Sequence, residues 1–228
     1  MHRPTARPVS RLILALAVVA GLALAPPAHA GPDQQQVVDQ AKATIEALKT
    51  DRTFGNAPKL LHRAKAIMIV PQLVKGGFFV GGEGGNAVLL ARTGGGWSYP
   101  AFYTVGAASF GLQIGIETAE VVFLVMSDRA LDAWMRNEVK LGAQAGLTVL
   151  VVGSNAEADA TTNANVDVIA WARSKGAYAG VTLEGSLIKP RDSYNEVYYG
   201  RKIGTREIIR NAAANPGAEP LRRVLSAM

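Results

Sequence analysis

Apolar residues at helical spacing predict several helices. The first covers residues 33–53, and its apolar face consists of Val38, Ala41, Ile45 and Leu48. Asp33 is a suitable N-cap for this helix, because a side-chain oxygen there can accept a free backbone N–H of the first turn. Shorter helices are expected at 57–64, from Ser127 to about Asn137, at 192–199 (a helix or a turn) and at 205–211.

Continuous or alternating apolar residues predict strands through most of the remaining chain. The apolar runs 66–70, closed by Pro71, and 120–126 indicate buried strands. Regular alternation predicts one half-buried antiparallel strand over 139–152 and another over 166–173. Residues 177–188 alternate again after a short connection, so we expect a hairpin in which Gly176 takes the left-handed conformation.

Half of the glycines lie in one stretch, residues 76–120, which holds 12 of the chain's 24. Each interior glycine costs a helix about 1 kcal/mol relative to alanine, and the recurring aromatic and aliphatic residues argue against disorder. The stretch therefore predicts closely packed strands, with turns at 81–86 and 93–96.

Together these elements predict an α+β protein. We expect a single domain over residues 31–211, built on a curved or barrel-like, mostly antiparallel β-sheet with a few flanking helices. Residues 212–228 contain Pro216, Gly217 and Pro220, and they are expected to form a mobile tail.

The first 30 residues have the pattern of a signal peptide. Arg3, Arg7 and Arg11 precede an apolar run over 12–25, and Ala28-His29-Ala30 fits a cleavage site. We expect cleavage after Ala30 and a periplasmic or secreted protein; an uncleaved anchor is the less favoured alternative. Cleavage would leave 21 basic against 18 acidic residues, a net charge of +3 in place of +6, which removes most support for nucleic-acid binding.

Few residues could carry metal or nucleophilic chemistry. The sequence has no cysteine, and His62 is the one histidine beyond residue 30. We therefore expect no metal, no cofactor and no histidine-based triad. The nucleotide-loop pattern at 82–87 lacks a following helix, so a turn is favoured there, and Ser186 and Lys189 form an S-x-x-K match on a strand followed by Pro190, outside the helical context such enzymes need.

Basic residues near the strand ends could meet anionic lipid headgroups. They include Lys175 at the expected hairpin tip and the pairs Lys189/Arg191 and Arg201/Lys202. The alternative is a solvated basic rim.

Long blocks of the chain resemble the SYLF domain family. The blocks are 65–71 (KAIMIVP), 75–87 (KGGFFVGGEGGNA), 97–100 (WSYP), 174–186 (SKGAYAGVTLEGS) and 198–200 (YYG), and the resemblance extends over about residues 35–211. In eukaryotes this family implies phosphoinositide binding and, in some members, actin binding; bacterial members resemble secreted or envelope proteins that bind lipid.

The resemblance implies a non-enzymatic lipid-binding module for anionic lipid or phospholipid. The contacts we expect are Lys75, Phe79, Trp97, Arg173, Lys175 and Tyr178. Two alternatives remain open: a structural or protein-interaction component of the cell envelope, and a hydrolase that uses carboxylates such as Glu117, Glu120 or Glu184. A host partner such as actin depends on export into a host.

Overall fold

The structure is a computed structural model. It describes residues 31–50, 57–77, 80–110, 115–136, 138–141, 147–152, 166–175, 183, 185–210 and 212–228. The expected signal peptide, and the predicted contacts Phe79 and Tyr178, lie outside these residues.

One curled sheet organises the described chain. Its strand order is β6-β9-β4-β2-β1-β5-β8-β7, with β3 paired to β2, and every pairing is antiparallel except that of β7 with β8. The strands are β1 (Ala66–Gly77), β2 (Val80–Thr93), β3 (Gly96–Trp97), β4 (Ala101–Phe110), β5 (Gly115–Val125), β6 (Val139–Lys140), β7 (Val149–Val152), β8 (Val168–Lys175) and β9 (Leu187–Pro190). The predicted α+β fold with a curved, mostly antiparallel sheet is confirmed.

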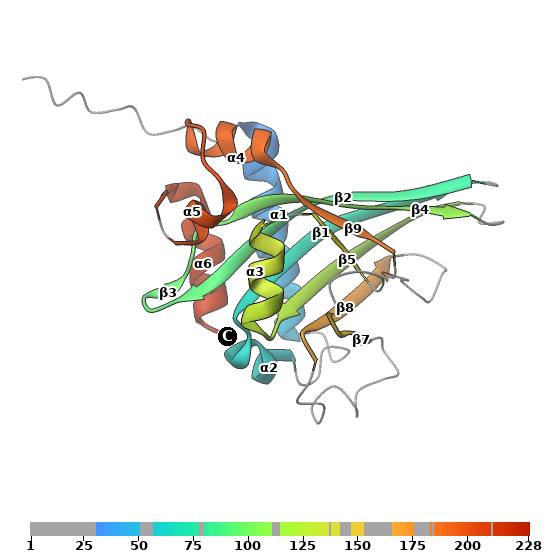
Figure 1. Cartoon of the computed structure of the whole chain (residues 1–228), viewed down its shortest axis with the longest axis horizontal. Helices are drawn as coiled ribbons and strands as arrows, with labels where there is room; N and C mark the ends of the chain where they lie inside the picture. Colours follow the sequence, from blue (N-terminus) through green and yellow to red (C-terminus); the bar gives the residue numbers. More distant parts are fainter. Residues whose placement is uncertain are drawn as a thin grey trace, which may run out of the picture.

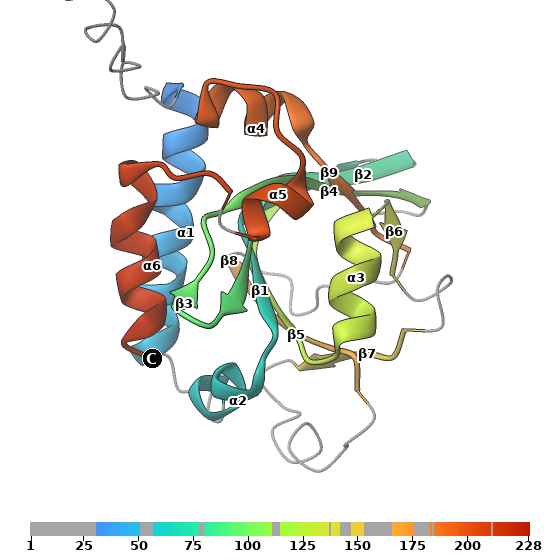
Figure 2. The same cartoon turned by 60° about the vertical axis from the view of Figure 1, so that its left-hand side comes forward.

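The helices lie on both faces of this sheet. They are α1 (Pro32–Thr50), α2 (Ala57–Arg63), α3 (Asp128–Arg136), α4 (Asp192–Tyr199), α5 (Thr205–Ile209), the short 3₁₀ turn η2 (Pro216–Ala218) and α6 (Glu219–Ser226). Figure 2 shows the sheet curling around α3, while α1 and α6 stand side by side outside it. We call the side that encloses α3 the inner face and the side that carries α1 the outer face.

Alternating side chains connect the sheet to both helical layers. On the inner face, the Phe123 ring meets the Trp134 ring of α3 edge-on at 5.8 Å, and the Tyr103 hydroxyl donates to the Trp134 carbonyl at 2.9 Å. On the outer face, Val122 and Leu124 pack against the apolar stripe of α1 that ends in Ile45 and Leu48. The core therefore has two layers, one on each side of the same strands.

The predicted strand over 139–152 is wrong in detail. Two separate strands, β6 and β7, lie at opposite edges of the sheet, and β7 runs parallel to β8. The expected hairpin over 174–188 falls mostly outside the described residues, and its described end, β9, pairs with β4 and not with β8. Alternation of apolar and polar residues identifies a half-buried strand, but it does not indicate which other strand it pairs with.

The predicted mobile tail is also wrong. Residues 212–228 contain η2 and α6, and Leu221 and Leu225 are buried against the rest of the protein. The Asn215 side chain accepts the Gly217 N–H, and Pro216 and Pro220 occupy first-turn positions of η2 and α6. Proline is well tolerated at a helix start, so these residues mark beginnings of helices here.

Candidate functional site

A β-bulge in the middle of β1 sets which side chains reach each face. The pairing of β1 with both β2 and β5 shifts by one residue around Val70 and Pro71. Pro71 cannot donate to a ladder hydrogen bond, and a bulge is where a central strand tolerates it. Ile67 and Ile69 face outward before the bulge, whereas Val74 and Gly76 do so after it, because the extra residue inverts the alternation.

Gly85 on β2 makes this bulge sterically feasible. A Cβ atom at Gly85 would lie 2.4 Å from the Gln72 carbonyl oxygen and 3.1 Å from Val70 Cγ1. Both atoms belong to the bulged segment of β1, so the close approach of the two backbones requires glycine.

We expect Gly85→Ala to lower the free energy of unfolding by about 1–3 kcal/mol, because the new methyl group overpacks the bulge. The adjacent Gly84→Ala is the matched control, since a Cβ there meets nothing within 4 Å. Chemical denaturation measures both variants, and equal losses of stability would contradict this account of the bulge.

A groove of about 230 Å³ opens on the outer face where the bulge meets α1. Its lining residues come from α1, β1 and β2 and are Val37, Gln40, Pro71, Gln72, Val74, Gly84, Gly85 and Asn86. Val74, at 39 % exposure, is one of two large hydrophobic residues classed as exposed in the described part of the chain. The groove thus combines an accessible apolar side chain with amide groups.

One end of the groove is basic. The Arg191 guanidinium binds the Asn86 side-chain oxygen and stacks 3.3 Å from the centre of the Tyr194 ring of α4. Lys189, exposed on β9, is the cross-strand partner of Thr104, which is in turn the partner of Asn86. Two cations therefore lie on the same side of the sheet as the groove.

The other end of the groove is continuous with exposed glycine residues of β1 and β2. Gly84 lies opposite Val74, and Gly82 lies opposite Gly76 in the next outward-facing pair. We call Gly76, Gly82 and Gly84 the glycine strip; all three are exposed, and the strands that carry them extend beyond the helices in Figure 1. Glycine inside a strand costs about 0.5–1 kcal/mol of stability relative to alanine, so stabilisation of the fold does not explain the glycine strip.

The predicted contacts Lys75 and Arg173 lie on opposite faces. Lys75 faces inward, where its ammonium is 3.0 Å from a Glu83 carboxylate oxygen and where Glu83 also accepts the Ser186 hydroxyl at 2.8 Å. Arg173 faces outward, and its guanidinium binds Glu120, with 2.8 Å from Nε to Oε2. Each of these basic side chains therefore has an acidic partner within the protein.

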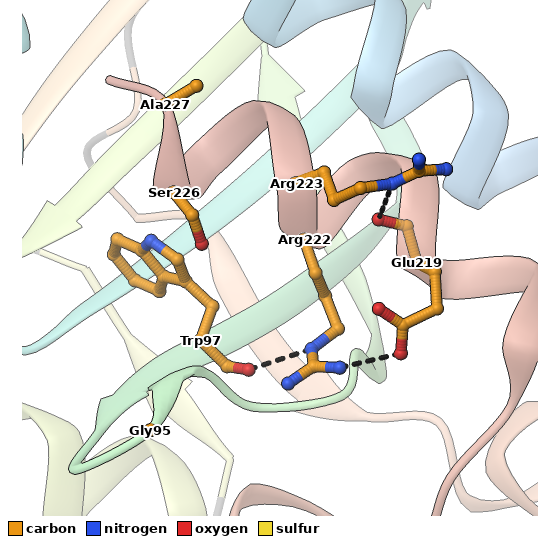
Figure 3. A pocket seen from close by; sticks show the side chains of 7 residues that line it. All are labelled: Gly95, Trp97, Glu219, Arg222, Arg223, Ser226 and Ala227. Atoms are coloured by element: carbon orange, nitrogen blue, oxygen red, sulfur yellow. Dashed lines mark hydrogen bonds and ion pairs between the residues drawn. The ribbon is translucent and has the colours of Figure 1, made fainter.

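The predicted contact Trp97 lies in a third place. It is 1 % exposed, and it lines a pocket of about 310 Å³ between β3 and α6 (Figure 3). The Arg222 Nε–H donates to the Trp97 carbonyl at 2.8 Å, and the Arg92 guanidinium lies 4.4 Å from the Trp97 ring centre. Only the backbone of Lys175 is described, in its pairing with Thr118. Lys75, Arg173 and Trp97, the predicted contacts whose side chains are described, therefore lie in three different places.

The pocket in Figure 3 holds an ion-pair network that ties α6 to the sheet. Arg222 donates to Glu219 at 2.6 Å, as Figure 3 shows. The Tyr99 hydroxyl, from outside that view, also donates to Glu219 at 2.5 Å. The hydrogen bond from Tyr99, followed by the Arg222 guanidinium, holds the pKa of Glu219 below its ordinary value, and the same bond raises the pKa of Tyr99. This arrangement explains the position of α6 without a ligand.

The arrangement of side chains disfavours the catalytic alternatives. Glu117 and Glu120 project from opposite faces of β5, and Glu184 lies outside the described residues. Ser186 contacts Glu83 on the inner face, whereas Lys189 is on the outer face, so the S-x-x-K pair does not converge. Among the described residues, no group of three His, Asp or Glu side chains could hold a metal ion, and no helix is both long and apolar enough to cross a membrane.

The groove is lined by residues that the sequence alone does not identify, among them Val74 and Asn86. Arg191, which contacts Asn86 at the edge of the groove, is in the sequence only one of several basic candidates. The predicted turn at 81–86 is instead part of β2, in which Gly82 and Gly84 point to one face and Glu83 to the other. The alternating order Gly-Glu-Gly is the signal that could have identified a bare outer face.

Comparisons with known proteins identify relatives along most of the chain. A family model named Ysc84, described as "Las17-binding protein actin regulator", matches residues 106–228. Protein YSC84 of Saccharomyces cerevisiae is 32 % identical over 194 residues, which are 81 % of this chain and 41 % of the yeast protein. The human SH3 domain-containing YSC84-like protein 1 is 29 % identical over 205 residues, 85 % of this chain and 60 % of its own length.

These relatives are longer proteins, and this chain spans about two fifths to three fifths of their length. The family match begins within β4 and includes β5 and every described element that follows it, through α6. The chain belongs to the Ysc84, or SYLF, family.

Proposed function

We propose that this protein is a non-enzymatic lipid-binding module that acts in the periplasm or after secretion, once the segment ending at Ala30 has been removed. The observation that carries the proposal is the outer-face groove, which joins a basic end to an exposed, uncharged end. An anionic amphiphile matches this groove, because it has a negatively charged end and an uncharged, apolar end. Family membership supports a binding role in general, because the family is described as "Las17-binding protein actin regulator" and one yeast relative is named LAS seventeen-binding protein 3.

Anionic lipid is favoured over neutral lipid by the charges at the basic end. Arg191 is oriented by Asn86 and Tyr194, both uncharged, so its positive charge is not neutralised by these contacts. Lys75 and Arg173, in contrast, are neutralised by Glu83 and Glu120. The cation for a headgroup is therefore Arg191, supported by Lys189.

We expect Arg191→Ala to weaken binding to anionic vesicles roughly fivefold, since one basic residue near an anionic surface contributes about 1 kcal/mol. Co-sedimentation with vesicles of phosphatidylglycerol and phosphatidylcholine measures this at low salt, and vesicles of phosphatidylcholine alone should bind weakly. Arg206→Ala removes an exposed arginine from α5 and is the control with the same change in net charge. Failure of the folded wild-type protein to bind anionic vesicles at low salt would refute the proposed function.

A protein-binding role in the cell envelope is the second candidate. It is favoured by the name of a yeast relative, LAS seventeen-binding protein 3, which is 32 % identical over 194 residues. Affinity purification from an envelope extract that returns a stoichiometric protein partner and no lipid would support this candidate over the first.

A further inference from the structure

Within the part of the chain that the structure describes, no contact requires glycine at the three positions of the glycine strip. Gly76, Gly82 and Gly84 are not among the described glycines with positive φ, so their backbone is one that any residue can adopt. A Cβ atom at Gly76 or Gly84 would meet nothing within 4 Å, and one at Gly82 would make an ordinary 3.5 Å contact with the Ala107 carbonyl oxygen. Neither conformation nor packing excludes a side chain at these positions.

At two neighbouring positions, packing within the protein does require glycine. At Gly85 a Cβ atom would be 2.4 Å from the Gln72 carbonyl oxygen, and at Gly106 it would be 3.2 Å from the Glu83 carbonyl oxygen. Those two positions need glycine because another strand is close. In a strand interior, glycine without such a neighbour often marks a place where a ligand approaches the backbone.

The space above the strip suits a thin, uncharged chain. Lys75 and Glu83, which alternate with the strip residues along β1 and β2, both point to the inner face. The three strip residues therefore present only backbone at the outer surface, and Val74 is an exposed side chain beside them in the described part of the chain. A bulky headgroup would make few contacts with the glycine strip, because no side chains project from it. An extended acyl chain, in contrast, can lie along the strip and contact its backbone.

The groove fixes the direction of such a chain. Its amide-lined end meets Arg191, through Asn86, and its opposite end opens onto the strip at Gly84. We propose that the groove and the glycine strip together bind one extended acyl chain of a single-chain anionic amphiphile, a fatty acid or lysophospholipid, with its anionic group at Arg191. This inference rests on the proposed lipid-binding function and specifies the ligand class and its orientation.

The test uses valine substitutions that block the path of the chain and leave the fold intact. Gly84→Val and Gly76→Val place a branched side chain in open space on an extended strand, where valine is favoured. Gly204→Val is the matched control, because Gly204 is also extended (φ −90°, ψ 158°), has nothing within 4 Å of a Cβ, and lies at the start of α5. Thermal unfolding establishes that all three variants fold.

Fluorescence titration with cis-parinarate, a single-chain fatty acid, gives the readout. We expect one bound chain per wild-type protein, binding at least about tenfold weaker in Gly84→Val and Gly76→Val, and unchanged binding in Gly204→Val. Equal binding by wild type and Gly84→Val would overturn the assignment of the strip and leave the lipid-binding function standing.

Other outcomes separate the two proposals further. A wild-type protein that binds anionic vesicles but not cis-parinarate would overturn the single-chain ligand alone, and one that binds neither would overturn both proposals. If Gly84→Val instead converts a dimer to a monomer in sedimentation analysis and leaves cis-parinarate binding unchanged, the occupant of the strip is a second copy and the inference is wrong.

Discussion

Replacing Asp167 with alanine is expected to lower the free energy of unfolding by about 2–4 kcal/mol, because three donors lose a buried acceptor. Asp167 is 4 % exposed and lies just before β8. It accepts from the Ser127 hydroxyl at 2.5 Å, from the Thr148 N–H at 2.9 Å and from Arg129 at 2.5 Å. The start of α3, the residue before β7 and the start of β8 are thereby joined at one carboxylate.

The measurement is chemical denaturation at neutral pH, with Asp132→Ala as the control. Asp132 is an exposed aspartate on α3, and its contact with Arg136 at 3.6 Å is a surface ion pair of small expected value. A loss in Asp167→Ala no larger than that in Asp132→Ala would contradict the proposed role of the carboxylate.

Asp167 should also make stability depend on pH. Burial alone would raise the pKa of this carboxyl, but the hydrogen bonds from Ser127, Thr148 and Arg129 outweigh it and hold the pKa below the ordinary value. The stabilisation is therefore present above the unfolded-state pKa, about 3.9, and is lost as the pH falls through the lower folded-state value. The stability difference between wild type and Asp167→Asn should shrink at acidic pH, and a constant difference from neutral pH to below pH 4 would contradict the depressed pKa.

Leu221→Ala is expected to destabilise the protein by about 2–5 kcal/mol, the usual cost of removing a fully buried leucine. Leu221 is 0 % exposed, and α6, which carries it, stands beside α1 in Figures 1 and 2. The Gln35 side chain of α1 also donates to the Gly217 carbonyl at 3.0 Å, just before α6.

Val224→Ala provides the comparison, since Val224 lies on the same helix but is only partly buried. Chemical denaturation should show a clearly smaller loss for Val224→Ala. If Leu221→Ala had no effect on stability, residues 212–228 would be the mobile tail that their proline and glycine content predicted.

The periodic segments could be predicted because their cause is local. The stripe over Val38, Ala41, Ile45 and Leu48 fits a helix that buries one face, and α1 confirms it. The helix expected from Ser127 is α3, and the Ser127 Oγ accepts the Ala130 N–H at 3.1 Å at its start. In both cases residues within one or two turns of each other decide the structure.

The candidate site could not be predicted in the same way, because it depends on which strands become neighbours. The predicted contacts Lys75 and Arg173 were chosen by residue type, yet the bulge at Pro71 turns Lys75 to the inner face and toward Glu83. Arg191 was indistinguishable in the sequence from other basic residues near strand ends. Its position beside Asn86, 105 residues away, arises from the pairing of β9 with β4 and of β4 with β2.

The sequence alone determined the family, the α+β class, the helices with regular apolar faces and the unusual concentration of glycine between residues 76 and 120. The family follows from the resemblance of whole blocks of sequence, and the other features follow from composition and short-range periodicity; all of these are properties of the chain itself. The tertiary structure decided the role of each glycine. Gly85 is required where two backbones approach, while Gly76, Gly82 and Gly84 leave open space on an exposed face. That distinction depends on where an added Cβ atom would lie relative to the backbones of the neighbouring strands, and strand pairing together with the bulge in β1 decides it.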